Sequence, residues 1–179
     1  TSRRLDLPGF VGTSTGENDI TTLSARLHAA YLLKRGTSYV KPFVNLDSVS
    51  IDSSGYTESG TGLYDLAVSG QKETAFVFTP AVEFGTAASI GNGWNSRLFA
   101  TVGVSISSMD SWTTSAQLAN APAGTSGFET SLPVSDVTGR VSLGAELWRG
   151  EGFDARIEYH GAFGDDYRSH AAMFKLTKR

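Results

Sequence analysis

Strict alternation of apolar and polar residues over long stretches is the sequence feature that most limits how this chain can fold. Residues 95–109 show it clearly, because small or charged residues separate apolar ones and Phe99 alone breaks the order. The apolar set there is Leu98, Ala100, Val102, Val104 and Ile106. A period of two places successive side chains on opposite faces of a β-strand. The same reasoning predicts strands over residues 22–34, 39–51, 73–86, 95–109, 134–149, 153–164 and 168–178.

The connections between these strands differ in length in a regular order. Short turns contain glycine, which supplies positive φ where a turn needs it, and they cover 35–38, 91–93 and 150–152. Long polar segments cover 1–21, 52–72 and 110–133. Outer-membrane barrels have short turns on the periplasmic side and long loops outside. The connection over 164–167 breaks the order, because it is short where a long loop is expected.

Strand length favours a membrane protein independently of the loops. The expected strands have about 11 to 16 residues, whereas strands of globular proteins usually have about 5 or 6. A tilted strand needs about 9 to 11 residues to cross a bilayer. No apolar run approaches the roughly 20 residues of a membrane helix. We therefore expect an all-β fold, an antiparallel transmembrane β-barrel with about seven to eight strands present.

The polar faces of the expected strands carry charges of both signs, separated by small residues. We expect these charged residues to face the barrel lumen, where they can pair: Arg26, His28, Glu83, Arg97, Arg140, Glu146, Arg156, Glu158 and His160. The opposite face is mostly Val, Leu, Ala and Ile, and we expect it to face lipid. Aromatic residues toward strand ends fit an interfacial girdle; they are Tyr39, Phe84, Trp94, Trp112, Trp148 and Phe153.

Alternation alone does not separate a membrane barrel from a soluble one that turns its apolar face inward. A soluble lipocalin-like barrel that binds an apolar ligand is therefore an alternative. A small outer-membrane barrel with a structural or adhesive role is another. A dry central core containing Leu98, Val102, Val104, Leu143 and Ile157 would exclude the membrane interpretation.

The sequence offers little for catalysis or for cofactor binding. The three histidines, His28, His160 and His170, are too far apart in sequence to suggest a metal site. Glu83, Glu146 and Glu158 resemble paired carboxylates, but Arg97, Arg140 and Arg156 on neighbouring strands offer them ion pairs instead. There is no cysteine, and the formal net charge is −3 without a basic run. We expect no enzyme activity, no cofactor, no metal and no nucleic-acid partner.

Three segments resemble the autotransporter β-domain, the C-terminal barrel of type V secretion proteins. The first runs from Leu23 to Tyr31 and is followed by Tyr39–Leu46, with Pro42 shortly after the turn. The second, Gly55–Gly60, is similar to the family's aromatic-x-Glu-x-Gly stretch and contains Glu58. Glu58 is the loop residue to single out, although an ordinary solvated acid is the simpler interpretation. The third resembles the family's closing hairpin and includes Tyr159, Gly161, Phe163 and Gly164.

The resemblance implies a barrel of about twelve strands, with a helix threading the pore and a passenger that the barrel delivers to the cell surface. It also implies localisation in the bacterial outer membrane, with outer-membrane lipid, the protein's own passenger domain and the outer-membrane assembly machinery as partners. We expect residues 1–179 to form a single β-barrel domain, the C-terminal part of a larger translocator domain.

The chain ends in Leu176-Thr177-Lys178-Arg179, whereas the family normally ends in an aromatic residue. An open strand edge in lipid is costly, so we expect a homo-oligomer through edge-strand pairing or a smaller closed barrel.

Overall fold

The computed structural model describes residues 1–122, 124–150, 152–165 and 167–178, and these residues form strands without helices. Glu151, Asp166 and Arg179, which belong to two expected connections and to the C-terminal stretch, lie outside the described residues. The strands are β1 (Ser2–Leu7), β2 (Phe10–Thr15), β3 (Ile20–Ala30), β4 (Leu33–Arg35), β5 (Ser38–Ser53), β6 (Tyr56–Thr57), β7 (Leu66–Val68), β8 (Gln71–Gly91), β9 (Trp94–Ser107), β10 (Ser111–Leu118), β11 (Phe128–Pro133), β12 (Val137–Arg149), β13 (Phe153–Phe163) and β14 (Arg168–Lys178).

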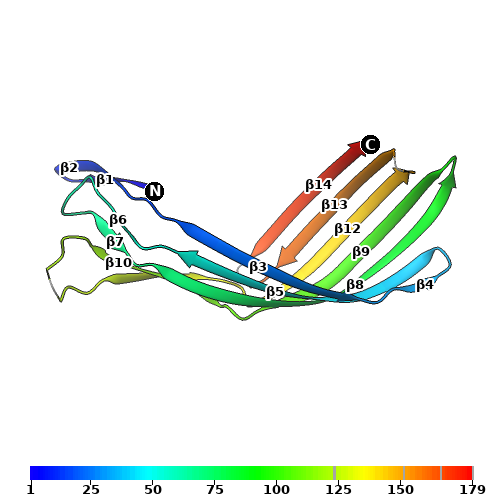
Figure 1. The fold of residues 1–179 in the computed structure, drawn as a ribbon, viewed down its shortest axis with the longest axis horizontal. Helices are drawn as coiled ribbons and strands as arrows, with labels where there is room; N and C mark the ends of the chain where they lie inside the picture. The colour runs from blue at the N-terminus through cyan, green and yellow to red at the C-terminus, as the bar shows by residue number, and fades with distance from the viewer. Residues whose placement is uncertain (123, 151, 166, 179) are drawn as a thin grey trace. The chain divides into compact units, whose positions relative to one another are not determined.

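The strands form three antiparallel sheets within two compact units. Unit 1 contains residues 1–25, 48–75 and 109–134, and unit 2 contains 26–47, 76–108 and 135–179. The longest sheet has the order β14-β13-β12-β9-β8-β5-β3, and β4 pairs with β5. In unit 2 the strands of this sheet lie side by side as a curled half-barrel (Figure 1). The all-β antiparallel fold that the alternation predicts is confirmed.

Short turns at one end of the long strands have the backbone geometry that their sequences suggest. Gly36 has φ 63°, Gly150 has φ 52°, and Asn92-Gly93 has φ values of 53° and 77°. Positive φ at both central residues suits the tight hairpin that joins two twisted strands, and Asn-Gly is the preferred pair there. Asn92-Gly93 joins β8 to β9, Gly150 lies between β12 and β13, and the pairing of β9 with β12 makes the antiparallel ladder continuous.

The segments expected as long polar loops contain strands of their own, which is a difference from the sequence-based interpretation. In unit 1, β1 and β2 form a hairpin, and β6, β7, β10 and β11 form a sheet in the order β11-β10-β7-β6. Ser and Thr are frequent in these strands and alternate weakly with apolar residues, so the period of two gave little signal there. Backbone pairing satisfies their N–H and C=O groups, as it must wherever water does not.

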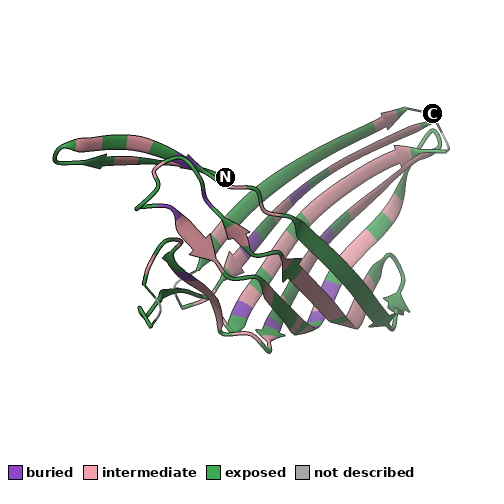
Figure 2. Cartoon of the chain, turned by 60° about the vertical axis from the view of Figure 1, so that its left-hand side comes forward, coloured by how far each residue is buried: buried purple, intermediate pink, exposed green. Residues whose placement is uncertain are grey.

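Burial separates the two faces of the long sheet in unit 2. The apolar residues named above as a possible dry core are exposed, with Leu98 at 56%, Leu143 at 52% and Ile157 at 57%. On the polar face, by contrast, Glu83 and Glu158 are 7% and 5% exposed. Figure 2 shows buried positions as short bands on inner strands of the sheet, while the edge strands β3 and β14 are mostly exposed. The apolar side chains are therefore not buried in a core, which is the pattern expected of a membrane barrel.

Candidate functional site: a charged face on the long sheet

The charged face of unit 2 is centred on Glu83 of β8. The Tyr39 hydroxyl donates to Glu83 Oε1 at 2.7 Å, and the Arg97 guanidinium donates to the same oxygen at 2.8 Å. Lys41 Nζ lies 3.0 Å from Glu83 Oε2. Because Glu83 is nearly buried, these three donors replace the water that an isolated carboxylate would need.

A second set of charges continues the same face across β9, β12 and β13. The register places Glu146 directly opposite both Arg97 and Arg156. Arg97 Nη1 lies 3.4 Å from Glu146 Oε2, and Arg156 Nη2 donates to Glu158 Oε1 at 2.6 Å. His160 Nε2 lies 3.7 Å from Glu158 Oε2. Arg97 and Glu146 form a favourable cross-strand pair, and the contacts of Arg156 and His160 with Glu158 extend the charged surface along β13.

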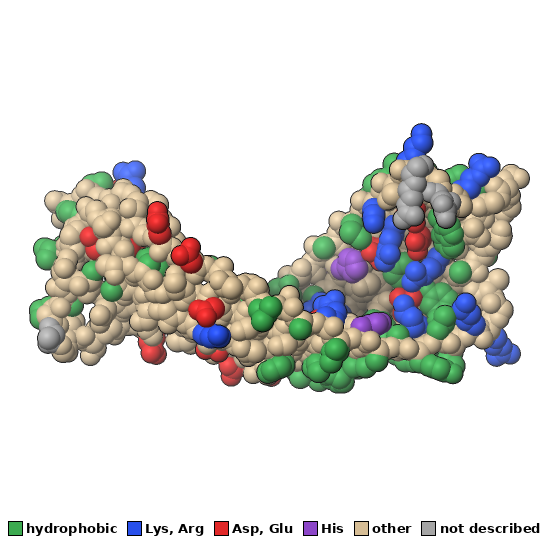
Figure 3. Space-filling model, in the orientation of Figure 1, with side chains coloured by type: hydrophobic (Ala, Val, Ile, Leu, Met, Phe, Trp, Pro, Cys, Tyr) green, Lys and Arg blue, Asp and Glu red, His purple; other side chains and the backbone are tan. Residues whose placement is uncertain are grey.

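Two aromatic rings fill this face because glycines leave room for them. The Phe99 ring, 8% exposed, lies 4.5 Å from the Arg97 guanidinium and 5.5 Å from that of Arg156. A Cβ added at Gly144 would lie 2.2 Å from the Phe99 ring, and one added at Gly85 would lie 2.4 Å from Tyr39. Figure 3 shows Lys, Arg and His side chains gathered in the hollow of this sheet. The result is a wall of paired charges with embedded aromatic rings.

The remaining residues expected on this face make smaller contacts. Arg26 forms an ion pair with Asp47, and His28 Nδ1 lies 2.6 Å from Asn45 Oδ1. Arg140 donates to the Ser105 hydroxyl at 2.5 Å. Its expected carboxylate partner is not found among the described residues, because Gly103 and Ala162 lie opposite it.

Unit 1 contains a second polar cluster that holds the β1–β2 hairpin against the segment 58–66. Arg3 donates to both oxygens of Glu58, from Nε at 3.1 Å and from Nη2 at 2.5 Å, and the Leu66 N–H adds a bond at 3.0 Å. Glu58 is 6% exposed, so the simpler interpretation of a solvated loop acid is wrong. The hydrogen bond from Arg3 lowers the pKa of Glu58 below its ordinary value.

Asp65 is the second carboxylate of the unit 1 cluster. The Ser14 hydroxyl donates to Asp65 Oδ1 at 2.7 Å, and the Thr61 and Gly62 N–H groups each donate at 2.9 Å. The Ser14 bond is the main reason that the pKa of Asp65 lies well below its usual range. Thr15 and Ser59 also exchange two backbone hydrogen bonds of 2.9 Å. Both carboxylates therefore position the hairpin.

The closing-hairpin residues lie on β13 and at its end. The Tyr159 hydroxyl lies 2.7 Å from His170 Nδ1, and the Phe163 ring meets the same imidazole at 5.5 Å. A Cβ at Gly161 would approach the Phe163 ring at 3.0 Å. A Cβ at Gly164 would approach Ser135 Oγ at 2.7 Å. These four positions therefore pack the last hairpin, and they do not contact the charged face.

Comparison with known proteins places the chain in a family. A family model, the autotransporter beta-domain, matches residues 1–160. The chain belongs to the autotransporter β-domain family. A search of curated proteins finds no match. Autotransporter β-domains are outer-membrane translocators and not an enzyme family, so membership implies the bacterial outer membrane and a passenger domain.

The architecture of this β-domain brings together most of the charged residues named from sequence, and it adds three that alternation missed. Tyr39, Lys41 and Phe99 belong to the charged face. Tyr39 had been assigned to an interfacial girdle. Tyr39 lies two residues from Lys41 and therefore on the same face of β5, so the alternation of side chains along the strand was enough to place Tyr39 on the charged face. Trp148 also lies on the polar face, beside Glu146 and Arg156, and Trp112 lies in unit 1. Phe84, Trp94 and Phe153 remain on the apolar face.

No helix long and apolar enough to cross a membrane occurs in the described ranges of the β-domain. No group of three or more His, Cys, Asp or Glu side chains is arranged to hold a metal ion in the part of the chain that the structure describes.

Proposed function

We propose that this β-domain delivers a passenger domain to the cell surface, with the charged face of unit 2 lining the passage. The observation that carries the proposal is the contrast between the two faces of one sheet. Glu83 and Glu158 are nearly buried among cations, whereas Leu98 and Ile157 are more than half exposed. In water this distribution would be unfavourable, because apolar surface would be solvated and charge would be desolvated. It suits a sheet with lipid on one side and a hydrated lumen on the other.

The chemistry of the charged face fits a polypeptide in transit. Paired charges and small hydroxyl residues, such as Thr101 and Ser142, present hydrogen-bonding groups to a passing chain. Glu83 pairs with Arg97 across β8 and β9, and Arg156 pairs with Glu158 along β13, so a passing chain meets a surface whose charges are already paired. Such a surface lets different sequences pass with little retention, which a translocator requires.

Single cysteines give a direct test, because the sequence contains none. A reporter passenger with one cysteine and a stably folded segment, fused ahead of the chain, would stall during export. We expect disulfides with the stalled passenger from Thr101→Cys and Ser142→Cys on the charged face. The matched variants Val102→Cys and Leu143→Cys, one residue along on the apolar face, should form none. Crosslinks from the apolar pair, or from neither pair while unstalled passenger reaches the surface, would contradict the proposal.

The edges of the long sheet require pairing partners for the same function. β3 and β14 end the sheet and are not paired with each other in the described residues. Unpaired backbone groups in lipid cost several kcal/mol each, so we propose that these edges pair with further strands or with a second copy. The size of the chain in detergent tests this, and a stable monomer with open edges would refute it.

A further inference from the structure

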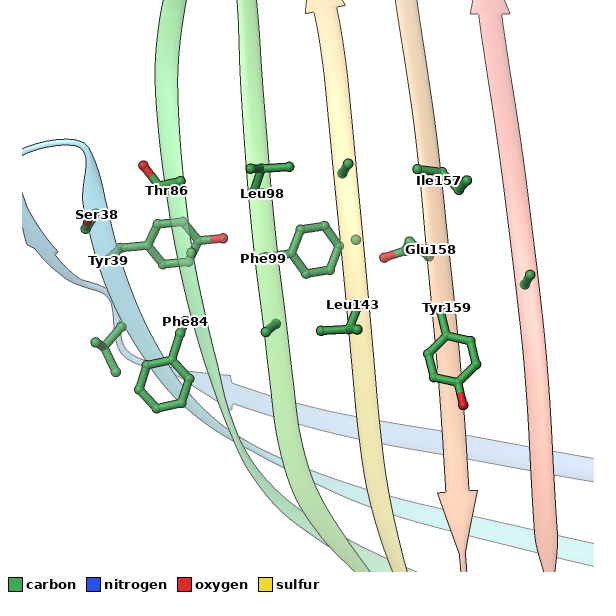
Figure 4. Close-up of a pocket in the computed structure, with 16 residues that line it drawn as sticks. Ser38, Tyr39, Phe84, Thr86, Leu98, Phe99, Leu143, Ile157, Glu158 and Tyr159 are labelled. Atoms are coloured by element: carbon green, nitrogen blue, oxygen red, sulfur yellow. The ribbon is translucent and has the colours of Figure 1, made fainter.

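The apolar face of unit 2 carries a shallow hollow of about 810 Å³. Its floor contains two alanines, each flanked across the ladder by large apolar residues. Ala100 lies between Phe84 and Leu143. Ala145 lies between Leu98 and Ile157. In Figure 4 the side chains of Leu98, Leu143 and Ile157 stand around the space that these small residues leave. A long, thin apolar group fits such a hollow better than a flat protein surface does.

Two cations lie on the same face at the turn end of the strands. Arg149 ends β12 and Lys178 ends β14, and both are exposed. Phe153 pairs with each of them in the ladder, so they are two strands apart, about 10 Å at the usual strand spacing. Neither forms an ion pair with another described residue. Their charges are therefore available to an anion.

An aromatic ring lies against one of these cations, Arg149. Trp94 pairs with Arg149 across the ladder, and the guanidinium lies 5.9 Å from the centre of its ring. Trp94 and Phe153 meet edge to face at 5.3 Å. Tryptophan and cationic side chains together mark the headgroup level of a bilayer. The cation pair thus lies where lipid phosphates would be.

The spacing between the cations and the hollow matches one lipid leaflet. Ala145 lies four residues before Arg149, about 13 Å along the strand, and Leu143 lies about 20 Å away. One leaflet of the hydrocarbon core is about 15 Å thick. In the row between, Leu147 is flanked on β9 and β13 by the small residues Ser96 and Ala155, which leave room for a chain beside it. A lipid whose phosphate met the cations would therefore place an acyl chain in the hollow.

We propose that unit 2 binds an anionic phospholipid, with its phosphate on Arg149 and Lys178 and one acyl chain over Ala145 and Ala100. The inference goes beyond translocation and rests only on the apolar face meeting the membrane. A zwitterionic lipid gains less, because its own ammonium group competes for the phosphate. Each cation near an anionic headgroup contributes about 1 kcal/mol, or about fivefold in binding.

Trp94 fluorescence tests the site. The chain has three tryptophans, so Trp112→Phe with Trp148→Phe leaves Trp94 as the only emitter. The full chain is reconstituted in vesicles that contain acyl-brominated phosphatidylglycerol or acyl-brominated phosphatidylethanolamine, whose bromines quench nearby tryptophan. We expect the anionic lipid to quench at a mole fraction at least about fivefold lower.

Three variants separate the parts of the site, and far-UV circular dichroism confirms that each is folded. Arg149→Gln with Lys178→Gln should abolish the preference for the anionic lipid, and Arg149→Lys should retain it. Ala145→Phe should weaken quenching by both lipids. Arg168→Gln, at the opposite end of β14, is the matched control and should change nothing. A preference that survives the double variant overturns the proposal.

Two other outcomes also overturn the proposal and are distinguishable. Equal quenching by both lipids would mean that the face meets the membrane without a specific site. Quenching by neither lipid would mean that the face does not meet lipid, as when a second copy of the chain covers it, and would also remove the basis of the translocation proposal.

Discussion

The two units of this β-domain use polar side chains differently. In unit 2 the ion pairs join residues of neighbouring strands, or of one strand, within a single ladder, and Arg97 lies directly opposite Glu146. In unit 1 the bonds join the β1–β2 hairpin to the segment 58–66, which pairs with the hairpin's backbone at the Thr15–Ser59 bridge. Arg3 and Glu58 are 55 residues apart, and Ser14 and Asp65 are 51 apart. Side-chain bonds in unit 2 therefore add stability to a sheet whose strand positions are set by backbone pairing. Side-chain bonds in unit 1 help to set the position of the β1–β2 hairpin.

The number of partners that each buried carboxylate has also differs between the two units. Glu83 in unit 2 has three side-chain donors, from Tyr39, Lys41 and Arg97. Glu58 in unit 1 relies on one cation, Arg3, and on one backbone N–H. We therefore expect single substitutions to affect unit 1 more than unit 2, even though unit 2 contains more charges.

The largest effect is expected from Glu58→Ala in unit 1. It leaves the Arg3 guanidinium without its carboxylate and removes the bond to the Leu66 N–H. Removing one partner of a buried pair costs about 3 kcal/mol or more, which we reduce to about 2 kcal/mol because Arg3 is partly exposed. Amide hydrogen exchange at Thr15 and Ser59 measures the opening of the hairpin. Unchanged protection there, with Arg3→Ala as the reciprocal variant, would show that the bridge does not depend on the pair.

Acid should weaken unit 1 through the same carboxylates. The pKa of Glu58 in the folded protein is lower than its ordinary value of 4.5. A lowered pKa gives stabilisation that is complete above the ordinary value and is lost as pH falls through the folded value. The pKa of Asp65 lies well below its usual range. The stabilisation that Asp65 contributes is therefore lost at a lower pH than that of Glu58. Hydrogen exchange at Ser59 should therefore rise below pH 4.5, in two stages, and Glu58→Gln should remove the first. A single stage in both proteins would contradict the assignment.

An intermediate effect is expected from Gly144→Ala in unit 2. The added Cβ would meet the Phe99 ring at 2.2 Å, and the ring is held between two guanidinium groups. Overpacking of this kind costs about 1 to 3 kcal/mol. Gly139→Ala on the same strand is the control, because its Cβ would meet nothing closer than 3.6 Å. Denaturant unfolding in detergent compares the two, and combining Gly144→Ala with Phe99→Ala should relieve the strain.

The sequence predicts the strands of this structure where apolar and polar residues alternate clearly. The strand expected over 153–164 is found at Phe153–Phe163, and that expected over 168–178 at Arg168–Lys178. Alternation with one apolar face fixes such strands and also fixes which residues share a face. The partners of Arg97 and Arg156 follow from that parity once the order of strands is known.

Contacts in unit 1 could not be predicted in this way. A resemblance singles out Glu58, but nothing in its neighbourhood points to Arg3, because side-chain bonds and the short backbone bridge between Thr15 and Ser59 hold the hairpin that carries Arg3. Polar strands rich in Ser and Thr have no apolar face to set a register. Pro80 in unit 2 interrupts the pairing of β8 with β9 without shifting it. Pairing stops at Phe78 and resumes at Ala81 in the same register, and the register shift of this pair of strands lies between Ser89 and Gly91.

The smallest effect is expected at the exposed pair of Asp52 and Lys72 in unit 1. Lys72 Nζ lies 3.6 Å from Asp52 Oδ2, and the side chains are 69% and 54% exposed. Water screens such a pair, and ordering two mobile side chains offsets the attraction, so exposed pairs contribute about 0 to 1 kcal/mol. We expect Asp52→Asn to change protection at Ser59 by less than about 0.5 kcal/mol. A loss as large as that of Glu58→Ala would mean that unit 1 depends on total charge, whereas a negligible loss ties its stability to the buried carboxylates alone.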